Sequence, residues 1–314
     1  MVRRLMARDG QVELREEQLP DVGRGDVCVR SHYSVVSPGT ERSIIRATQR
    51  SVSAAHEYPH PAFEWPKIRS ASVRGQTRRP RLPPQDAASL GYSLAGVVER
   101  VGEDVTDLWP GDRVACSGSQ CAYHAERVVV PRNLVAPVPD AVALADAAHV
   151  TLGAIALEAF RRTACTLGET LLVVGSGMLG LLLTQLATRA GVYVVALDID
   201  RRRLDLATGF GALSTVSTAD ADAVTTIRTR TDGFGADAAI IAAAGPESEL
   251  VNFAFASLRP GGRVVALGDF GMDINRALFF RAQATFVPSI AYGPGRYDPV
   301  YEENNVDLPI NVVR

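Results

Sequence analysis

A glycine-rich stretch near the middle of the chain has the residue types and spacing to bind phosphate groups. Residues 175–180 lie between an apolar run at 171–174 and a leucine-rich segment of helical periodicity at 181–187. The first glycine allows a tight turn, the second lets backbone N–H groups approach a pyrophosphate, and the third lets helix and strand pack closely. The start of the helix offers further N–H groups to the phosphates. The residues predicted to bind a dinucleotide are Gly175, Ser176, Gly177, Met178, Leu179 and Gly180.

An acidic residue extends this pattern. A second apolar run at 192–197 ends on Asp198, about twenty residues beyond the glycine loop. There a carboxylate can accept hydrogen bonds from both hydroxyls of an adenosine ribose, and it would repel a 2′-phosphate. Asp198 therefore favours NAD over NADP. The arginines at 201–203 could instead bind a 2′-phosphate, lie over the adenine or cover the next helix, and Arg201 is included among the predicted cofactor contacts.

Four side chains elsewhere could move the proton that accompanies a hydride transfer. Thr40 and Glu41 belong to the string Ser-Pro-Gly-Thr-Glu, where both could instead cap a turn. His124 and His149 are candidates because a histidine side chain can give and take a proton near neutral pH. A single histidine is more often a packed or surface residue, so both interpretations stay open for each.

The composition indicates a globular protein of about two domains. With 314 residues, 46% of them apolar, the chain can bury a substantial core, and a net charge of −2 gives no basis for binding nucleic acid or an anionic membrane. No apolar run reaches the roughly 18–20 residues of a membrane span, and no signal peptide is evident. The cysteines are too scattered for a disulfide framework, so a cytoplasmic protein is expected: Cys28, Cys116, Cys121 and Cys165.

Residues 1–147 are expected to form a β-barrel-like domain. Short β-rich segments separated by Gly, Pro and Asp lie at 27–30, 34–36, 95–101, 113–115 and 126–130. Residues 43–90 form an irregular insertion, in which 43–50 could start a helix and His56 and His60 are expected to be solvated. A stretch of this kind is typical of a lid, a partner surface or disorder.

Residues 148–292 are expected to form a doubly wound parallel sheet. Strands at 238–242, 263–267 and 284–290 alternate with helices, one of them at 247–258. The residues that complete the predicted cofactor contacts are Thr151 and Ala243. Residues 293–314 are turn-rich and are expected to pack back onto the first domain.

Several strings resemble the medium-chain dehydrogenase/reductase superfamily, which includes zinc alcohol dehydrogenases and quinone reductases. They lie at 91–115, 122–140, 147–160 and 258–271. The resemblance spans nearly the whole chain and implies an α/β protein with an N-terminal GroES-like β-barrel domain and a Rossmann domain. Residues 37–43 (SPGTERS), 91–96 (GYSLAG) and 292–299 (YGPGRYDP) further resemble a bacterial subgroup that is often linked to, or encoded beside, a second sugar-type oxidoreductase.

The chain departs from the zinc enzymes at the metal ligands. By this resemblance the ligand positions of the catalytic zinc carry Ser37, Tyr92 and Thr151, and hydroxyl groups are poor zinc ligands beside thiolate and imidazole. Only Cys116 and Cys121 stand where structural zinc needs four cysteines. The resemblance therefore implies a protein without zinc, in which Tyr92 could donate a proton or be a buried structural residue, and Thr151 could meet the nicotinamide or begin a helix.

The leading interpretation is a zinc-independent NAD-dependent dehydrogenase. It would pass hydride between nicotinamide C4 and a secondary alcohol or ketone of a polar, sugar-like or biosynthetic substrate, with Tyr92, Glu41 or a nearby histidine supplying the proton. The alternatives are quinone or enoyl reduction, and a non-catalytic dinucleotide-binding partner subunit. An early C-terminus by comparison with the subgroup motivates the last. Tyr292, Arg296 and Tyr297 could bind a polar substrate or form an interface, and residues 284–290 could pair in a homodimer.

Overall fold

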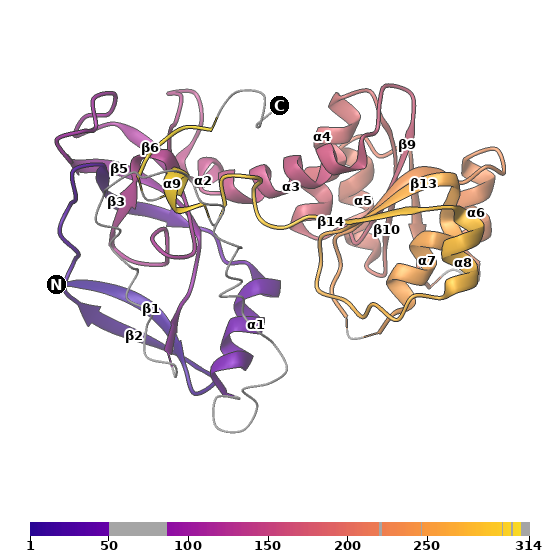
Figure 1. The fold of residues 1–314 in the computed structure, drawn as a ribbon, viewed down its shortest axis with the longest axis horizontal. Helices are drawn as coiled ribbons and strands as arrows, with labels where there is room; N and C mark the ends of the chain where they lie inside the picture. The colour runs from indigo at the N-terminus through magenta and orange to yellow at the C-terminus, as the bar shows by residue number, and fades with distance from the viewer. Residues whose placement is uncertain (50–86, 220–221, 246, 297, 303, 309–314) are drawn as a thin grey trace. The chain divides into compact units, whose positions relative to one another are not determined.

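The computed structural model describes residues 1–49, 87–219, 222–245, 247–296, 298–302 and 304–308 (Figure 1). The chain divides into two compact units. The first comprises Met1–Thr151 with Tyr297–Val312, and the second comprises Leu152–Arg296. The division therefore falls within a helix, a few residues after the boundary predicted at 147/148.

The first unit is built mainly from β-sheet. One sheet has the strand order β2-β1-β4, and an antiparallel sheet has the order β7-β3-β5-β6-β8. The β-rich N-terminal domain is thereby confirmed. The strands are β1 (Val2–Arg8), β2 (Gln11–Glu17), β3 (Asp26–Ser34), β4 (Ala87–Ser89), β5 (Ser93–Val101), β6 (Arg113–Ser117), β7 (Arg127–Pro131) and β8 (Val135–Pro137). The helices of this unit are α1 (Pro38–Gln49), η1 (Arg132–Leu134), α2 (Leu144–Ala147) and α9 (Pro299–Glu302).

Two local predictions for this unit are wrong. Residues 34–36 are not a separate strand, because β3 continues through Ser34. The helix expected from residue 43 begins at Pro38, so the Ser-Pro-Gly-Thr-Glu string enters a helix rather than forming an isolated turn. Proline is tolerated there because the first N–H groups of a helix have no intrahelical partner. His56 and His60 lie outside the described residues.

The described part of the C-terminal tail lies against the first unit. The side-chain oxygen of Asn305 accepts a hydrogen bond from the Asn133 N–H at 2.8 Å, and its amide group donates to the Gly25 carbonyl at 2.8 Å. Gln120 donates to the buried Glu302 carboxylate at 3.2 Å. These polar contacts join segments far apart in the sequence.

The second unit contains a parallel sheet with the strand order β11-β10-β9-β12-β13-β14. The predicted doubly wound α/β domain is confirmed. The strands are β9 (Thr170–Val174), β10 (Tyr193–Asp198), β11 (Ser214–Ser217), β12 (Ala236–Ile241), β13 (Leu258–Ala266) and β14 (Thr285–Pro288). The helices are α3 (Val150–Thr163), α4 (Met178–Arg189), α5 (Arg201–Gly209), α6 (Ala223–Arg230), α7 (Glu249–Ser257) and α8 (Arg276–Ala282). The strand predicted from residue 263 begins earlier, at Leu258, because the Arg-Pro-Gly-Gly segment is still extended.

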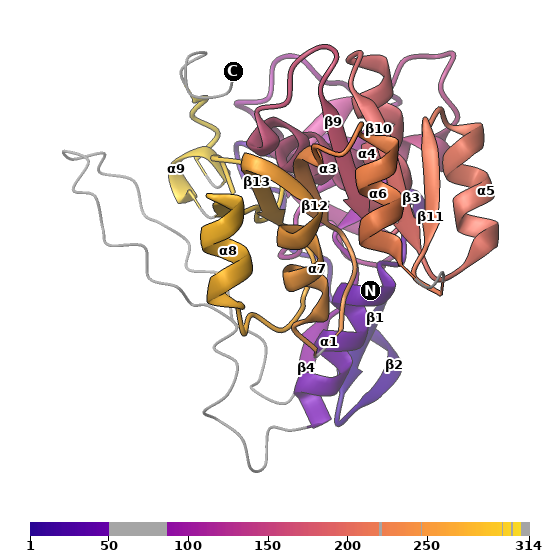
Figure 2. The ribbon, with the colours of Figure 1, turned by 90° about the vertical axis from the view of Figure 1, so that its right-hand side faces the viewer.

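Helices cover both faces of this sheet (Figure 2). Because side chains alternate along a strand, Leu171 and Val173 of β9 pack with residues of α3, α4 and α5. Leu172 and Val174 pack with residues of α6, α7 and α8 on the other face. This burial explains why the central strands are apolar throughout. The strand order reverses between β9 and β12, and ligands of such sheets bind outside the strand ends at that point.

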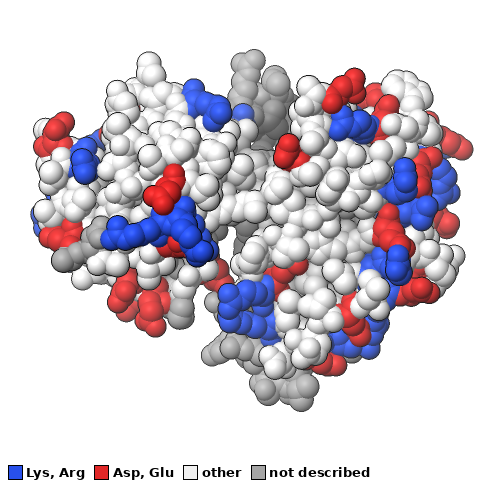
Figure 3. Space-filling view, turned by 180° about the vertical axis from the view of Figure 1, so that it is seen from behind, with Lys and Arg blue, Asp and Glu red and all other residues white. Residues whose placement is uncertain are grey.

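The described residues on the face seen in Figure 3 show no large field of one charge. Acidic and basic side chains lie beside one another over this face. Ion pairs between such side chains include those of Arg24 with Glu103 and Asp104, both at 2.6 Å. Among the described helices, none is long and apolar enough to cross a membrane.

The edge position of β14 generates a prediction about assembly. An edge strand presents unpaired backbone groups, and pairing across a two-fold axis would satisfy them. We expect a homodimer in static light scattering at micromolar concentration. Thr285→Lys on β14 should shift the mass towards the monomer, whereas Ser214→Lys on the opposite edge strand β11 should not. A wild-type monomer would contradict this expectation.

Candidate functional site

The turn from β9 into α4 requires glycine at two positions for steric reasons. Gly175 has φ +98°, and a Cβ added there would lie 2.8 Å from the Cβ of Ala243. A Cβ at Gly180 would collide with the carbonyl oxygen of Gly175. These two glycines are therefore needed to build the loop. Ala243, a predicted cofactor contact, is placed beside this loop just after β12.

Gly177 is different, because neither its backbone conformation nor any neighbour among the described residues requires glycine there. Its φ is −73°, which any residue can adopt, and no heavy atom lies within 4 Å of an added Cβ. It is the N-cap of α4, and no side chain caps the helix there. The backbone N–H groups at this end are thus available to a phosphate group, and the missing side chain leaves room for one.

The carboxylate of Asp198 is anchored at the end of β10. It is 6% exposed and accepts hydrogen bonds from the N–H groups of Ser176 at 2.7 Å and Asp200 at 2.8 Å. The strand therefore holds the carboxylate next to the glycine loop. Ser176 is buried, whereas Met178 is exposed and Leu179 is half-buried.

The arginines that follow have distinct surroundings. Arg202 binds Asp200, the N-cap of α5, at 3.0 Å, and this contact holds the pKa of the Asp200 carboxyl below its usual value. Arg203 lies 3.6 Å from the Asp198 carboxylate. Arg201 is exposed. Arg203 is thus a cation beside the Asp198 carboxylate that the sequence analysis did not single out.

In the first unit, two predicted proton carriers meet. His124 Nε2 lies 3.2 and 3.3 Å from the two carboxylate oxygens of Glu41, although 83 residues separate them in the chain. The two side chains are buried, with 7% and 6% of the residues exposed. His124 Nδ1 lies 2.8 Å from the hydroxyl of Ser34, an exposed residue at the end of β3. Sequence reasoning missed Ser34, since a serine at a strand end carries no signal of its own.

The pair is held in place from both sides. The Ser37 N–H donates to Glu41 Oε1 at 2.8 Å. The His124 backbone is fixed by hydrogen bonds with Leu90 and Leu5 at 2.8 and 2.9 Å. Gly91, with φ +89°, lies against the imidazole, because a Cβ there would come within 2.8 Å of Nδ1. The ring and the carboxylate therefore have little freedom to reorient.

Among the described residues, no side-chain hydrogen bond joins the other predicted proton carriers to this pair. Thr40 is exposed and its hydroxyl lies 3.3 Å from that of Ser37. His149 is exposed, with Nδ1 3.1 Å from the Ala145 carbonyl. Tyr92 is half-buried, and its carbonyl accepts a hydrogen bond from Gly118 at 3.0 Å.

Thr151 is fully buried within the first unit. Its hydroxyl lies 2.7 Å from the hydroxyl of Ser117, and it also reaches the carbonyls of Tyr92 and Cys116 at 3.4 and 3.5 Å. These contacts give Thr151 a structural role at the start of α3. The predicted contact of Thr151 with nicotinamide stays a prediction.

Comparison with known proteins agrees with this geometry. Residues 65–140 match the alcohol dehydrogenase GroES-like domain, and residues 179–304 match the zinc-binding dehydrogenase family. A probable D-xylulose reductase A from Neosartorya fischeri is 31% identical over 247 residues, which are 68% of this chain and 68% of that protein. The chain belongs to the medium-chain dehydrogenase/reductase superfamily. As a member of this superfamily it is an NAD(P)-dependent oxidoreductase.

Further relatives include polyol-phosphate dehydrogenases. Galactitol 1-phosphate 5-dehydrogenase from Escherichia coli is 31% identical over 162 residues, 43% of this chain and 47% of that enzyme, so this match spans about half of it. The crystal structure of galactitol-1-phosphate dehydrogenase from Escherichia coli has a TM-score of 0.72 at 20% identity and covers 94% of this chain and 85% of its own. A Pseudomonas syringae quinone oxidoreductase has a TM-score of 0.71 at 21% identity, with coverages of 93% and 82%. These structures show the shared fold.

Zinc, which the superfamily implies, does not fit the residues present. The positions compared with zinc ligands carry the hydroxyls of Ser37, Tyr92 and Thr151, and the Thr151 hydroxyl is already hydrogen-bonded. Burial raises the pKa of the Cys116 thiol, which disfavours the thiolate that zinc needs. Glu41 and His124 could supply two ligands. Over the described ranges, no group of three His, Cys, Asp or Glu side chains is placed to hold a metal.

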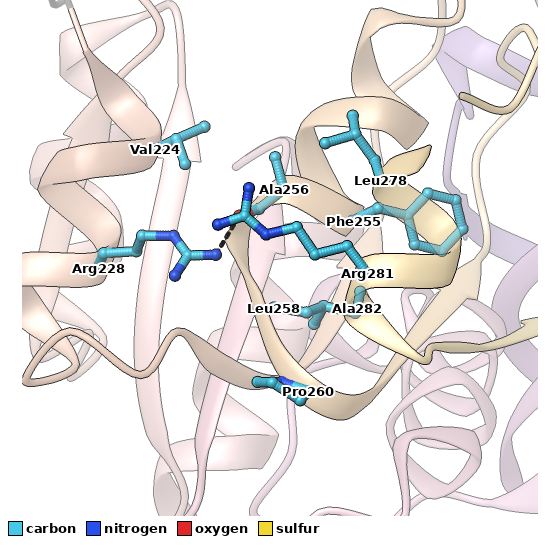
Figure 4. A pocket seen from close by; sticks show the side chains of 9 residues that line it. All are labelled: Val224, Arg228, Phe255, Ala256, Leu258, Pro260, Leu278, Arg281 and Ala282. Atoms are coloured by element: carbon cyan, nitrogen blue, oxygen red, sulfur yellow. Dashed lines mark hydrogen bonds between the residues drawn. The ribbon is translucent and has the colours of Figure 1, made fainter. Parts of the chain in front are cut away.

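A hollow of about 230 Å³ in the second unit is lined by two arginines whose positions are explained by the ends of the helices that carry them. Arg228 and Arg281 extend towards one another across its apolar floor (Figure 4). Both stand in the last turns of their helices, α6 and α8, and Arg228 donates to the Ala256 carbonyl near the end of α7 at 3.0 Å. Cations at these places stabilise helix C-termini. We therefore assign Arg228 and Arg281 a structural role rather than a role in ligand binding.

The open space at Gly177 leads to a prediction about nucleotide binding. Gly177→Val should fold, because an added Cβ has no heavy atom within 4 Å and the backbone conformation suits any residue. It should weaken NADH binding at least tenfold in a fluorescence titration, because the side chain fills the space of the pyrophosphate. Gly180→Ala is the matched control. Its methyl group collides with backbone, so it should lower the melting temperature itself. Unchanged NADH affinity in folded Gly177→Val would refute the assignment of the loop.

Proposed function

We propose that this protein is a zinc-independent, NAD-dependent dehydrogenase that interconverts a secondary alcohol and a ketone on a polyol-like substrate. The observation that carries the proposal is the buried Glu41–His124 pair. A hydride transfer to or from a carbonyl needs a group that exchanges a proton with the oxygen, and an imidazole beside a carboxylate is suited to that exchange at neutral pH.

Different residues of the chain would carry out different parts of the reaction. Bound nicotinamide would accept or donate the hydride. The N–H groups around Gly177 would hold the pyrophosphate, and Asp198 would bind the ribose hydroxyls. His124 would take the proton of the substrate hydroxyl during oxidation and return it during reduction. Glu41 would stabilise the imidazolium formed in between, since a nearby opposite charge favours the charged form.

The proposed substrate class rests on the relatives and on the chemistry of the pair. A D-xylulose reductase and a galactitol 1-phosphate dehydrogenase both act on hydroxylated carbon chains by their names. A polyol presents adjacent hydroxyl groups, of which one can be oxidised while the others hydrogen-bond to the protein. Polyols and ketoses are therefore the first substrates to test.

The experiment is a comparison of three reactions. We expect NADH to be consumed with a ketose such as D-xylulose, and not with a quinone or an activated alkene. His124→Gln should lower kcat about 10²–10⁴-fold, the usual contribution of general acid–base catalysis, and leave the Kd of NADH unchanged. His149→Gln, at the exposed histidine, is the matched control and should keep its activity. Turnover with the quinone or alkene alone would favour a reductase, and no turnover would favour a non-catalytic partner subunit.

Zinc content provides a second test. Because hydroxyl groups stand at the compared ligand positions, the purified active protein should contain no stoichiometric zinc by elemental analysis. Its ketose reductase activity and its melting temperature should survive prolonged treatment with a chelator. One zinc per chain, removed together with the activity and restored by adding the metal, would show that the proposal is wrong.

Asp198 generates the prediction for cofactor preference. NADH should bind at least tenfold more tightly than NADPH, because opposing like charges and an unpaired buried acceptor each cost on the order of 1–3 kcal/mol. Asp198→Ser should weaken NADH binding and improve NADPH binding, with Arg203 left to face the 2′-phosphate. Arg203→Met in the same background should remove that gain. Tighter NADPH binding by the wild-type protein would overturn the preference.

A further inference from the structure

The hydroxyl of Ser34, to which the dehydrogenase mechanism above gives no role, extends the Glu41–His124 pair into a longer hydrogen-bonded chain. Its oxygen lies 2.8 Å from His124 Nδ1, and the opposite ring nitrogen lies 3.2 Å from Glu41. Ser34 is exposed, whereas the other two residues are buried. Ser34 and His124 also line a surface depression of about 340 Å³ together with His32 and Tyr33. Ser34 is thus an exposed residue whose hydroxyl is hydrogen-bonded to a buried histidine, and that histidine is hydrogen-bonded to a buried carboxylate.

Hydrogen-bond donors and acceptors determine the direction of this chain. An ionised carboxylate can only accept, so the neutral imidazole must place its hydrogen on Nε2, facing Glu41. Nδ1 then carries the lone pair and accepts the hydroxyl hydrogen of Ser34. This is the arrangement in which a histidine removes the proton of a serine, with the carboxylate fixing the tautomer. The two ring nitrogens are exchanged relative to serine proteases, and their chemical roles are the same.

We propose that Ser34, His124 and Glu41 form a nucleophilic centre that hydrolyses small carboxylic esters without a nucleotide. Ser34 Oγ would bond to the ester carbonyl carbon while its proton passes to His124 Nδ1. The ester C–O bond then breaks, and the alcohol leaves with that proton. Water attacks the acyl-serine with His124 again as base, which releases the carboxylic acid and restores the hydroxyl.

The surroundings of Ser34 match this use. The ring of His124 packs closely against Gly91 on one side and is hydrogen-bonded to Glu41 and Ser34 through its two nitrogens. Side chains that could donate to the carbonyl oxygen line the same depression. The guanidinium groups of Arg3 and Arg4 are engaged with carboxylates, while the side chains of His32 and Tyr33 make no hydrogen bond to any other described residue. The size of the depression suits short acyl groups such as acetyl.

The experiment uses two probes and no nucleotide. Wild-type protein should release one equivalent of p-nitrophenolate per chain from p-nitrophenyl acetate in a burst, followed by slower turnover. A fluorophosphonate should label the tryptic peptide that contains Ser34, as located by mass spectrometry. Ser34→Ala should lose the burst and the label, and His124→Gln should reduce the labelling rate at least a hundredfold. Ser37→Ala, which removes a neighbouring hydroxyl, is the control and should keep both.

The outcomes separate this proposal from the dehydrogenase. Ser34→Ala should still bind NADH like the wild type, which shows that the variant is folded. An equal burst in Ser34→Ala, or a label on another residue, would overturn the nucleophilic centre and leave the dehydrogenase untouched. Wild-type protein that hydrolyses the ester but neither binds nor oxidises NADH would support the centre and refute the dehydrogenase.

Discussion

The close approach of backbone to backbone in the turn from β9 into α4 is the constraint on which the candidate nucleotide site depends. Gly175 must adopt a left-handed conformation beside Ala243, and Gly180 must touch the carbonyl of Gly175. Once the chain is bent in this way, the start of α4 points its N–H groups outwards. The Ser176 N–H is then turned to the carboxylate of Asp198. The relative placement of the loop, the helix end and the Asp198 carboxylate therefore follows from one steric condition. Gly177 is the position at which space remains for a ligand.

The first unit depends on a different condition, the burial of two ionisable groups. Removing a carboxylate and an imidazole from water costs several kcal/mol unless both are hydrogen-bonded. Here Glu41 accepts from His124 and from the Ser37 N–H, and His124 also meets Ser34. Burial of this kind is weak evidence for stability, because an apolar pair of similar size would avoid the cost. A chemical use for the pair is a better explanation of its presence.

The sequence predicts the second unit better than the first, for physical reasons. Buried parallel strands are continuously apolar, and the glycine loop has a fixed spacing, so the β9–α4–β10 segment can be read residue by residue. The hairpin of β1 and β2 is missed because β2 (QVELREE) is charged and largely exposed. The individual roles of Glu41 and His124 can be proposed from their types. The contact between Glu41 and His124 cannot be predicted in this way, because it depends on how β3, α1 and the segment before β7 meet in three dimensions.

The same tautomer of His124 underlies both proposed activities, and this limits how they can coexist. A neutral ring with its hydrogen towards Glu41 has one lone pair, on Nδ1, and Ser34 occupies it. A substrate hydroxyl must therefore either replace the Ser34 hydroxyl at Nδ1 or pass its proton to His124 through the Ser34 oxygen. In the second case Ser34 would lie between the substrate and the imidazole, and an acyl group on Ser34 would block the proton path. Acylation of Ser34 should then suppress ketose reduction while nucleotide binding is kept, which links the two activities through one hydrogen bond.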